Sequence, residues 1–149
     1  QGYPQTLSTI DRIDYSNDTA AAASKGPLSA GRYLLAAVSN GSYGWWAGGS
    51  PSPTKSTIDR TDFSNDTATA SVRGPLSRET FRCNAMGNND YGYIAFGDPA
   101  SSPFVATGID RIDYSNDTAT TSPKGHLTGA RMNTGAVTAA ENGFPQFGG

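Results

Sequence analysis

The stretch Ile10-Asp11-Arg12-Ile13-Asp14-Tyr15-Ser16-Asn17-Asp18-Thr19 decides the fold, because the chain contains it three times. It returns over 58–67 with two differences, Thr61 and Phe63, and over 109–118 without change. The copies start at residues 10, 58 and 109, so their spacings are 48 and 51 residues. A period near 50 residues is typical of repeat architectures. The chain is therefore predicted to be a single domain of repeated units.

Each copy sits in the same surroundings, and these predict β-structure. Residues 9–15 alternate β-branched or aromatic side chains with charged ones, which indicates a strand, and the Asn-Asp pair after it indicates a turn. A basic-Gly-(Pro or His)-Leu-(Ser or Thr) turn follows at 25–29, 73–77 and 124–128. The apolar run 32–38, the Asn40-Gly41 turn and the run 43–49 predict a hairpin. Four strands are therefore expected in each unit.

The whole chain, 1–149, is predicted to be one repeat domain with units at about 2–43, 44–91 and 92–142. Residues 143–149 would begin a further unit. Because Gly2-Tyr3-Pro4-Gln5 resembles Gly143-Phe144-Pro145-Gln146, the chain is expected to be cut inside a unit. The strands at its ends would then be completed by another copy or by further sequence, and two copies would make a ring of six units.

Composition narrows the function classes. The net charge of -2 offers no field to attract nucleic acid or an anionic membrane, and no apolar run approaches the length of a membrane span. The single cysteine, Cys83, excludes an intrachain disulfide and is expected in the core. The single histidine, His126, stands where the other units have proline, so neither a catalytic triad nor a metal site is expected. No enzyme activity and no cofactor are predicted.

The unit resembles kelch repeats, in which an aromatic strand ends in a glycine doublet and leads to an acidic strand and an outer strand. The doublets here are Gly48-Gly49 and Gly148-Gly149, whereas the second unit departs with Gly97-Asp98. The tryptophan that kelch repeats usually carry in the outer strand is absent from all three units. The resemblance implies an all-β fold of three four-stranded antiparallel blades of a β-propeller.

The near-verbatim copies also resemble repeats in large virion proteins of tailed phages, which implies a structural or fibre-like role. On this resemblance we expect a non-enzymatic structural or adhesion module of a phage particle, located in the virion or outside the cell, that contacts a host surface. Two alternatives stay open. One is a carbohydrate-binding propeller, and the other is a subunit of an extracellular, glycosylated bacterial fibre.

The repeated charges are the candidate structural residues, since identical seams between units require identical side chains. Arg12 and Asp14 share a strand face, so Arg12 is placed to bond a carboxylate of its own or the next unit, and Asp11 or Asp14 is placed to accept backbone N–H groups. The seam candidates are Asp11, Arg12, Asp14, Asp59, Arg60, Asp62, Asp110, Arg111 and Asp113. The same stretch has two alternative readings: Ca²⁺ ligation by Asp11, Asp14, Asn17 and Asp18, and N-glycosylation at Asn17, Asn65 and Asn116.

The aromatic residues of the hairpins are the candidate ligand-binding residues. Trp45, Trp46, Tyr91 and Tyr93 offer flat apolar faces with polar edges, which suit stacking on sugar rings. Alternation along the strand is expected to bury one of the two tryptophans and to turn the other outward. The expected partners are other copies of the chain and a host-surface glycan.

Overall fold

The computed structural model describes residues 6–50, 53, 55–99, 106–138 and 146–148. This part of the chain is all-β, as predicted, with antiparallel strands, three short 3₁₀ helices and no α-helix. The strands are β1 (Asp11–Arg12), β2 (Ala23–Ser24), β3 (Ala36–Ser39), β4 (Tyr43–Ala47), β5 (Ile58–Asp62), β6 (Ser71–Arg73), β7 (Thr80–Phe81), β8 (Asn84–Gly87), β9 (Tyr91–Ala95), β10 (Asp98–Pro99), β11 (Gly108–Asp113), β12 (Ser122–His126), β13 (Gly135–Val137) and β14 (Gln146–Gly148). The 3₁₀ helices are η1 (Tyr15–Asn17), η2 (Phe63–Asn65) and η3 (Tyr114–Asn116).

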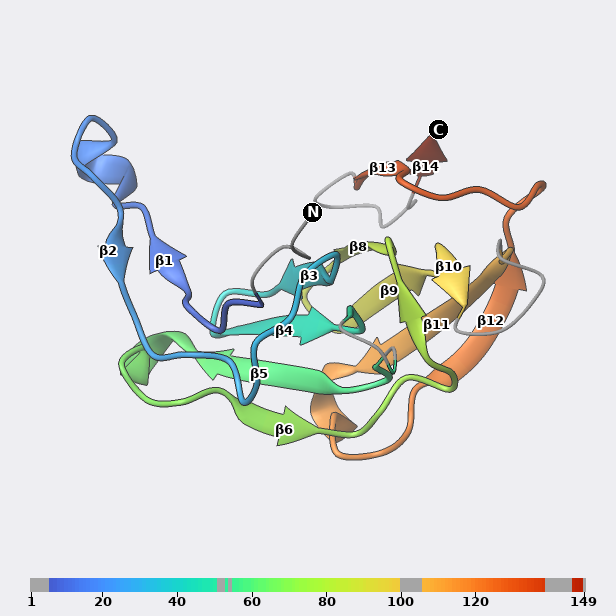
Figure 1. The fold of residues 1–149 in the computed structure, drawn as a ribbon, viewed down its shortest axis with the longest axis horizontal. Coiled ribbons are helices and arrows are strands. Elements are labelled where there is room, and N and C mark those ends of the chain that lie inside the picture. Colours follow the sequence, from blue (N-terminus) through green and yellow to red (C-terminus); the bar gives the residue numbers. More distant parts are fainter. Residues whose placement is uncertain (1–5, 51–52, 54, 100–105, 139–145, 149) are drawn as a thin grey trace.

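Two four-stranded antiparallel sheets form the body of the molecule (Figure 1). The first has the order β3-β4-β5-β6, and the second has the order β12-β11-β9-β8. The predicted turn at Asn40 is confirmed, because its Oδ1 accepts the N–H groups of Ser42 and Tyr43, each at 2.9 Å. Asn88 closes the β8–β9 hairpin in the same way. Identical turn chemistry therefore gives the two sheets identical inner hairpins.

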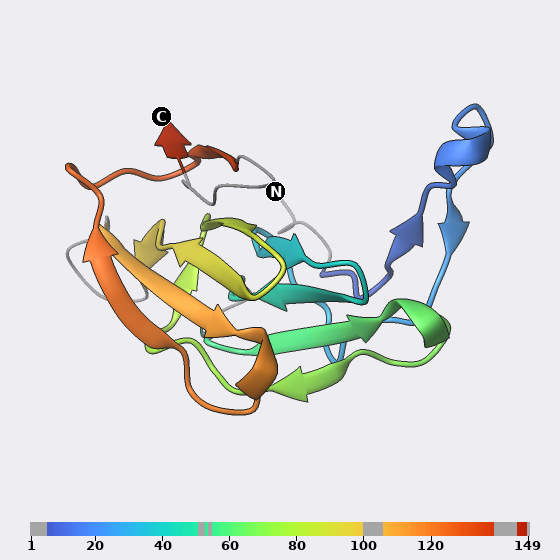
Figure 2. The same ribbon diagram turned by 180° about the vertical axis from the view of Figure 1, so that it is seen from behind.

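Three smaller pairs complete the topology: β7 with β10, β1 with β2, and β13 with β14. The β1–β2 ribbon stands away from the two sheets in both views (Figures 1 and 2). The described residues thus form two four-stranded sheets, and the completion of a third blade by another copy or by further sequence stays a prediction. The sheets run from residue 36 to 73 and from 84 to 126, so the predicted unit boundaries after residues 43 and 91 fall within β4 and within β9. Sequence spacing gives the length of a unit, whereas strand pairing decides where a sheet begins.

The strand predicted over 32–38 is interrupted at Leu34, which has a φ of 57°. Arg82 and Asn133 have the same left-handed backbone, with φ of 53° and 54°. Leucine and arginine are rarely left-handed, and such a conformation interrupts a strand. The strand predicted over 9–15 is likewise short, since β1 pairs over two residues only. Its equivalent β5 has partners on both sides and extends over five residues.

The core lies between the two sheets, which pack against each other. Its buried residues come from both sheets and from the segments that join them: Ala36, Val38, Trp45, Ala47, Ile58, Leu76, Cys83, Ile94, Phe96, Ala106 and Ile112. A smaller cluster of Ile10, Leu28 and Ala70 joins the β1–β2 ribbon to the first sheet. The burial of apolar side chains between neighbouring units therefore holds the row together.

Cys83 is expected to resist thiol reagents while the protein is folded. Its side chain is buried, and this burial raises the pKa of the thiol from 9.0 to about 11. At pH 8 the thiolate fraction then falls on the order of 100-fold, and the thiolate is the reacting form. Labelling with a chromogenic disulfide should be slow in buffer and fast in guanidinium chloride. Rapid stoichiometric labelling of the folded protein would contradict the buried position.

Candidate functional site

The turn after each repeated strand is fixed by an aspartate that caps a 3₁₀ helix. Asp62 Oδ1 accepts the N–H and O–H groups of Ser64 at 2.8 and 2.7 Å. These two bonds, led by the side-chain one, lower the pKa of the Asp62 carboxyl. Asp14 and Asp113 make the same bonds and have pKa values lowered for the same reason. The capped turn presents the aspartate four residues later to the neighbouring unit.

Asp117, presented by the third turn, is the centre of the seam between the two sheets. Its Oδ2 accepts from the indole Nε1 of Trp45 at 2.9 Å and from Arg60 at 3.0 Å. The Arg73 guanidinium lies 3.6 Å from the same oxygen. Trp45, Arg60 and Arg73 belong to the first sheet, and the aspartate follows the third strand of the second. One buried carboxylate therefore ties a later unit to three side chains of an earlier one.

Asp66 repeats this arrangement one unit earlier. Its carboxylate binds Arg12 at 2.5 Å and Lys25 at 3.3 Å, both on or beside the β1–β2 ribbon. Arg12 and Lys25 hold the positions of Arg60 and Arg73 in the repeat. Arg12 was predicted to bond a carboxylate of its own unit or of the next one. It bonds a carboxylate of the next unit, Asp66, which the prediction did not name.

A glycine makes the close backbone contact at each seam. The Gly26 N–H donates to the main-chain oxygen of Asp66 at 2.8 Å. A Cβ on Gly26 would overlap the carbonyl oxygen of Ala68. Gly74 has the same relation to Ala119. Because the two backbones approach this closely, only glycine fits either position.

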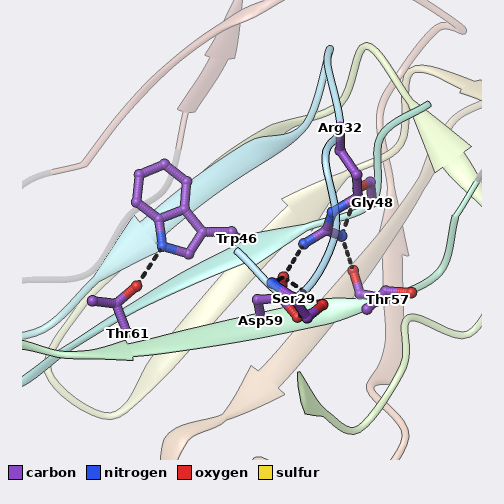
Figure 3. Close-up of polar contacts among 7 residues, drawn as sticks. All are labelled: Ser29, Arg32, Trp46, Gly48, Thr57, Asp59 and Thr61. Carbon is purple, nitrogen blue, oxygen red and sulfur yellow. Dashed lines mark hydrogen bonds and ion pairs between the residues drawn. The ribbon is translucent and has the colours of Figure 1, made fainter. Parts of the chain in front are cut away.

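Asp59 ties the first sheet to the connection that precedes it (Figure 3). Its carboxylate is fully buried and accepts from the N–H of Ser29 at 3.0 Å, from the Ser29 hydroxyl at 2.7 Å and from Arg32 at 2.7 Å. Arg32 also donates to the carbonyl oxygens of Gly48 and Thr57, at 3.0 and 2.9 Å. The buried charges are therefore paired and hydrogen-bonded, which a stable buried ion pair requires.

The second sheet makes the equivalent connection without a cation. Asp110 is fully buried and accepts from the N–H of Ser77 at 2.7 Å and from its hydroxyl at 2.8 Å, and the third donor is the Thr121 hydroxyl. Thr80 stands at the position that Arg32 has in the first unit. The repeat thus satisfies the same buried carboxylate in two chemically different ways.

Seven of the nine predicted seam candidates fall into three groups, and Asp11 and Arg111 stand apart. Arg12 and Arg60 reach the next unit, and Asp59 and Asp110 bind the preceding connection. Asp14, Asp62 and Asp113 stay within their own turns. Asp11 is exposed and has no side-chain hydrogen bond or ion pair within the described part of the chain, and Arg111 lies over the Tyr91 ring at 4.3 Å. Among the described residues, the seams on either side of the first sheet are therefore the complete ones.

The four candidate aromatic residues do not form one platform. Trp45 is 0% exposed, and its ring stacks on Tyr114 with centroids 3.9 Å apart. Trp46, on the other face of β4, is half-buried and donates from Nε1 to the Thr61 hydroxyl at 3.0 Å (Figure 3). Tyr91 and Tyr93 are half-buried on β9. One tryptophan is thus inward and the other partly outward, as strand alternation predicted.

A groove of about 630 Å³ opens between the β1–β2 ribbon and the first sheet. Its walls include Ile13 and Tyr15 on the ribbon side, and Trp46, Thr61 and Phe63 on the sheet side. Tyr15 is 93% exposed, although its equivalent Tyr114 is stacked on a tryptophan. The groove therefore exposes an aromatic side chain whose equivalent is stacked and half-buried at the seam between the two sheets.

The three predicted glycosylation residues are exposed and equivalent. Asn17, Asn65 and Asn116 each end a 3₁₀ helix, and each Oδ1 accepts from the threonine hydroxyl two residues later at 3.3–3.5 Å. Glycosylation stays a prediction. In the described part of the chain, no group of three or more His, Cys, Asp or Glu side chains is placed to hold a metal ion.

The sequence analysis missed the residues that complete the seam. The acidic positions are Asp18, Asp66 and Asp117, and the basic positions are Lys25, Arg73 and Lys124. The signal was present, because each position has the same charge in all three units. The sequence spacing could not show that an aspartate bonds an arginine more than 50 residues away.

Comparison with known proteins adds no further constraint on the site. No helix in the described ranges is long and apolar enough to cross a membrane. A scan against models of protein families matched none of them, and a search of curated proteins returned no match.

Proposed function

We propose that the chain is a non-enzymatic structural module, in which successive units form a row of kelch-like propeller blades. The observation that carries the proposal is the carboxylate at each seam, which reaches from a later unit to two cations of an earlier one. Because the same geometry occurs at two seams, we infer that these charged residues serve to attach one unit to the next. In this view the repeat exists to join units in a fixed register.

Energetics favour register as the role of these charges. A hydrogen bond to a charged group contributes about 1.5–3 kcal/mol where it is well formed and shielded, as at Asp117. The Arg12 pair contributes less, since the Arg12 side chain is 58% exposed and water screens it. A slipped register would leave the buried Asp117 unpaired, which is far more costly than the pair is favourable. The seam therefore selects one arrangement of neighbouring sheets.

The order of strands supports the propeller arrangement. In each four-stranded sheet, strands that follow one another along the chain lie side by side, as in a propeller blade. The two sheets pack face to face. The near-verbatim repeats support a place in a phage particle, as a fibre or decoration component in the virion or outside the cell. Immunogold labelling of particles or fibres from the producing cells tests this. Regular label along assembled structures is expected, and label confined to the cytosol would contradict the proposal.

Carbohydrate binding is the second candidate, and the groove beside the β1–β2 ribbon favours it. If sugar rings stack in this groove, Trp46→Ala is expected to weaken glycan binding by about 0.5–1.5 kcal/mol, the contribution of an aromatic contact beyond its area. Glycan-array binding followed by calorimetry would measure the loss. Tyr93→Ala is the control, because Tyr93 lies outside the groove. Equal losses in both variants, or no binding by the wild type, would contradict this function.

A further inference from the structure

We propose that β13–β14 of one copy and β1–β2 of a second copy of this chain join into one four-stranded sheet. The inference rests on the proposed structural role and specifies its partner, a second copy of the chain. The new sheet would place β14 of one copy beside β1 of the other. Four independent features of the described residues support this pairing: strand edges, charges, one glycine and exposed apolar side chains.

The two small pairs are complementary halves of the sheet that the chain builds twice. In the first sheet, Ala36 lies opposite Ala47, and Ala47 lies opposite Ile58. The β13–β14 pair contains the first two strands of this pattern, and Gly148 has the place of Ala47. The β1–β2 pair contains the last two strands, and Ile10 has the place of Ile58. Gly148 of one copy would therefore face Ile10 of the other.

Both halves offer an open edge for this pairing. Within the described residues, β14 pairs only with β13, and β1 pairs only with β2. The corresponding edges of β4 and β5 are paired with each other along five residues. An open strand edge is a template for another strand, and the matching half provides one with the correct direction and register.

The charges of an incomplete seam match across the two copies. Arg111 and Lys124 occupy the positions of Arg60 and Arg73, yet neither has an ion pair within the described ranges. Asp18 occupies the position of Asp117 and is exposed. One copy thus presents the two cations, and the other presents the carboxylate that binds such cations at both existing seams.

Gly125 holds the position of Gly26 and Gly74, but within the described ranges no backbone lies close beside it. A Cβ on Gly26 or Gly74 would overlap the next unit, whereas a Cβ on Gly125 would meet no atom of the described residues within 4 Å. Gly125 does not have a left-handed backbone, so its own conformation does not require glycine. The residue in contact at the completed seam would be Ala20 of the second copy, since it is equivalent to Ala68 and Ala119.

Exposed apolar side chains complete the match. Val137 on β13 is 66% exposed, whereas its equivalents Val38 and Met86 are buried. Ile13 beside β1 is 56% exposed, whereas its equivalent Ile112 is 2% exposed. Tyr15 would stack on Tyr93 of the other copy. Its equivalent Tyr114 stacks in this way on Trp45, which holds the position of Tyr93 one unit earlier. Joining the halves would bury all of these groups.

Two copies suffice to close the row. The described residues of each copy form two complete four-stranded sheets and one half at either side, so two copies joined at both sides would contain six sheets. Closed propellers typically contain 4–8 blades. The groove beside the β1–β2 ribbon would then receive the β13–β14 pair of the second copy.

The mass of the protein in solution tests the inference. Light scattering of the purified chain should give twice 15.5 kDa. Gly125→Ala should give 15.5 kDa with an unchanged circular dichroism spectrum, because the added methyl group meets no atom within 4 Å in the described part of its own chain. Gly41→Ala is the matched control, since a Cβ there also meets nothing, and this residue lies in a hairpin turn away from the seam. A wild-type monomer, or a Gly125→Ala dimer, would overturn the inference.

A mixing experiment tests whether the β13–β14 side of one copy joins the β1–β2 side of the other. Asp18→Lys should also be monomeric, because a lysine would face Arg111 and Lys124, whereas Asp90→Lys at an exposed hairpin turn should stay dimeric. Mixing Asp18→Lys with Gly125→Ala chains creates one seam without either change, so dimers of one copy of each should reappear. Failure to recover them from two folded monomers would overturn the pairing. A monomeric wild type would overturn this inference alone, since immunogold labelling decides the structural role separately.

Discussion

Replacing Trp45 by alanine is expected to lower the free energy of unfolding by about 3–5 kcal/mol, the range for a buried tryptophan. Trp45 fills the space between the two sheets, stacks on Tyr114 and donates to Asp117. The substitution therefore leaves a cavity and removes a donor from a buried carboxylate. Urea unfolding followed by circular dichroism would measure the loss.

Trp46→Ala is the matched control for Trp45→Ala. Trp46 is the adjacent residue of the same strand, but it is only half-buried and its main polar contact is the Thr61 hydroxyl. The expected loss in the free energy of unfolding is about 1–2 kcal/mol, because folding buries less apolar surface at this site than at Trp45. Equal losses for the two variants would contradict the assignment of Trp45 to the seam and Trp46 to the groove.

Asp59→Ala is expected to destabilise the protein by about 3–5 kcal/mol, because it leaves the buried Arg32 guanidinium without its counter-charge. The Arg32 side chain is 2% exposed, and the substitution also removes the acceptor for both donors of Ser29. The carbonyl oxygens of Gly48 and Thr57 stay in place but do not neutralise the cation. Chemical unfolding would show the change in midpoint.

The second unit provides a compensating control for Asp59→Ala. Arg32→Thr alone should destabilise, because the buried carboxylate of Asp59 would lose its cation. Adding Ala70→Thr should recover part of the loss, because it reproduces the Thr80 and Thr121 pattern around Asp110, where a threonine hydroxyl is the third donor. A double variant that is no more stable than Arg32→Thr would show that the two connections are not equivalent.

Local chemistry made much of the fold predictable. The repeat indicated β-strands at a fixed spacing, and Asn40 and Asp14 fix the turns that their residue types predict. The left-handed backbone at Leu34 was not predictable, because leucine gives no local signal for it. The short extent of β1 was not predictable either. Strand pairing is a long-range property, and within the described residues β1 has no equivalent of the β4 neighbour that makes β5 a full strand.

The candidate site was predictable only in part, for a similar reason. The sequence indicated that Arg12 and Arg60 bond to carboxylates, but three aspartates of each repeat were available as partners. Packing selected Asp66 and Asp117, since the capped turn carries them across the seam. Alternation correctly separated Trp45 from Trp46, yet which of them faces the core depends on the neighbouring sheet.

The seam also gives the row of sheets a polarity. At both seams the later unit contributes the carboxylate and the earlier unit contributes the cations. Reversing one unit within an array would bring carboxylate to carboxylate on one side and cations to cations on the other. An array built from this repeat therefore has all its units pointing the same way, and its two ends differ in charge. Like ends repel each other and unlike ends attract each other. One aspartate in each repeat therefore determines the direction in which units add to the array.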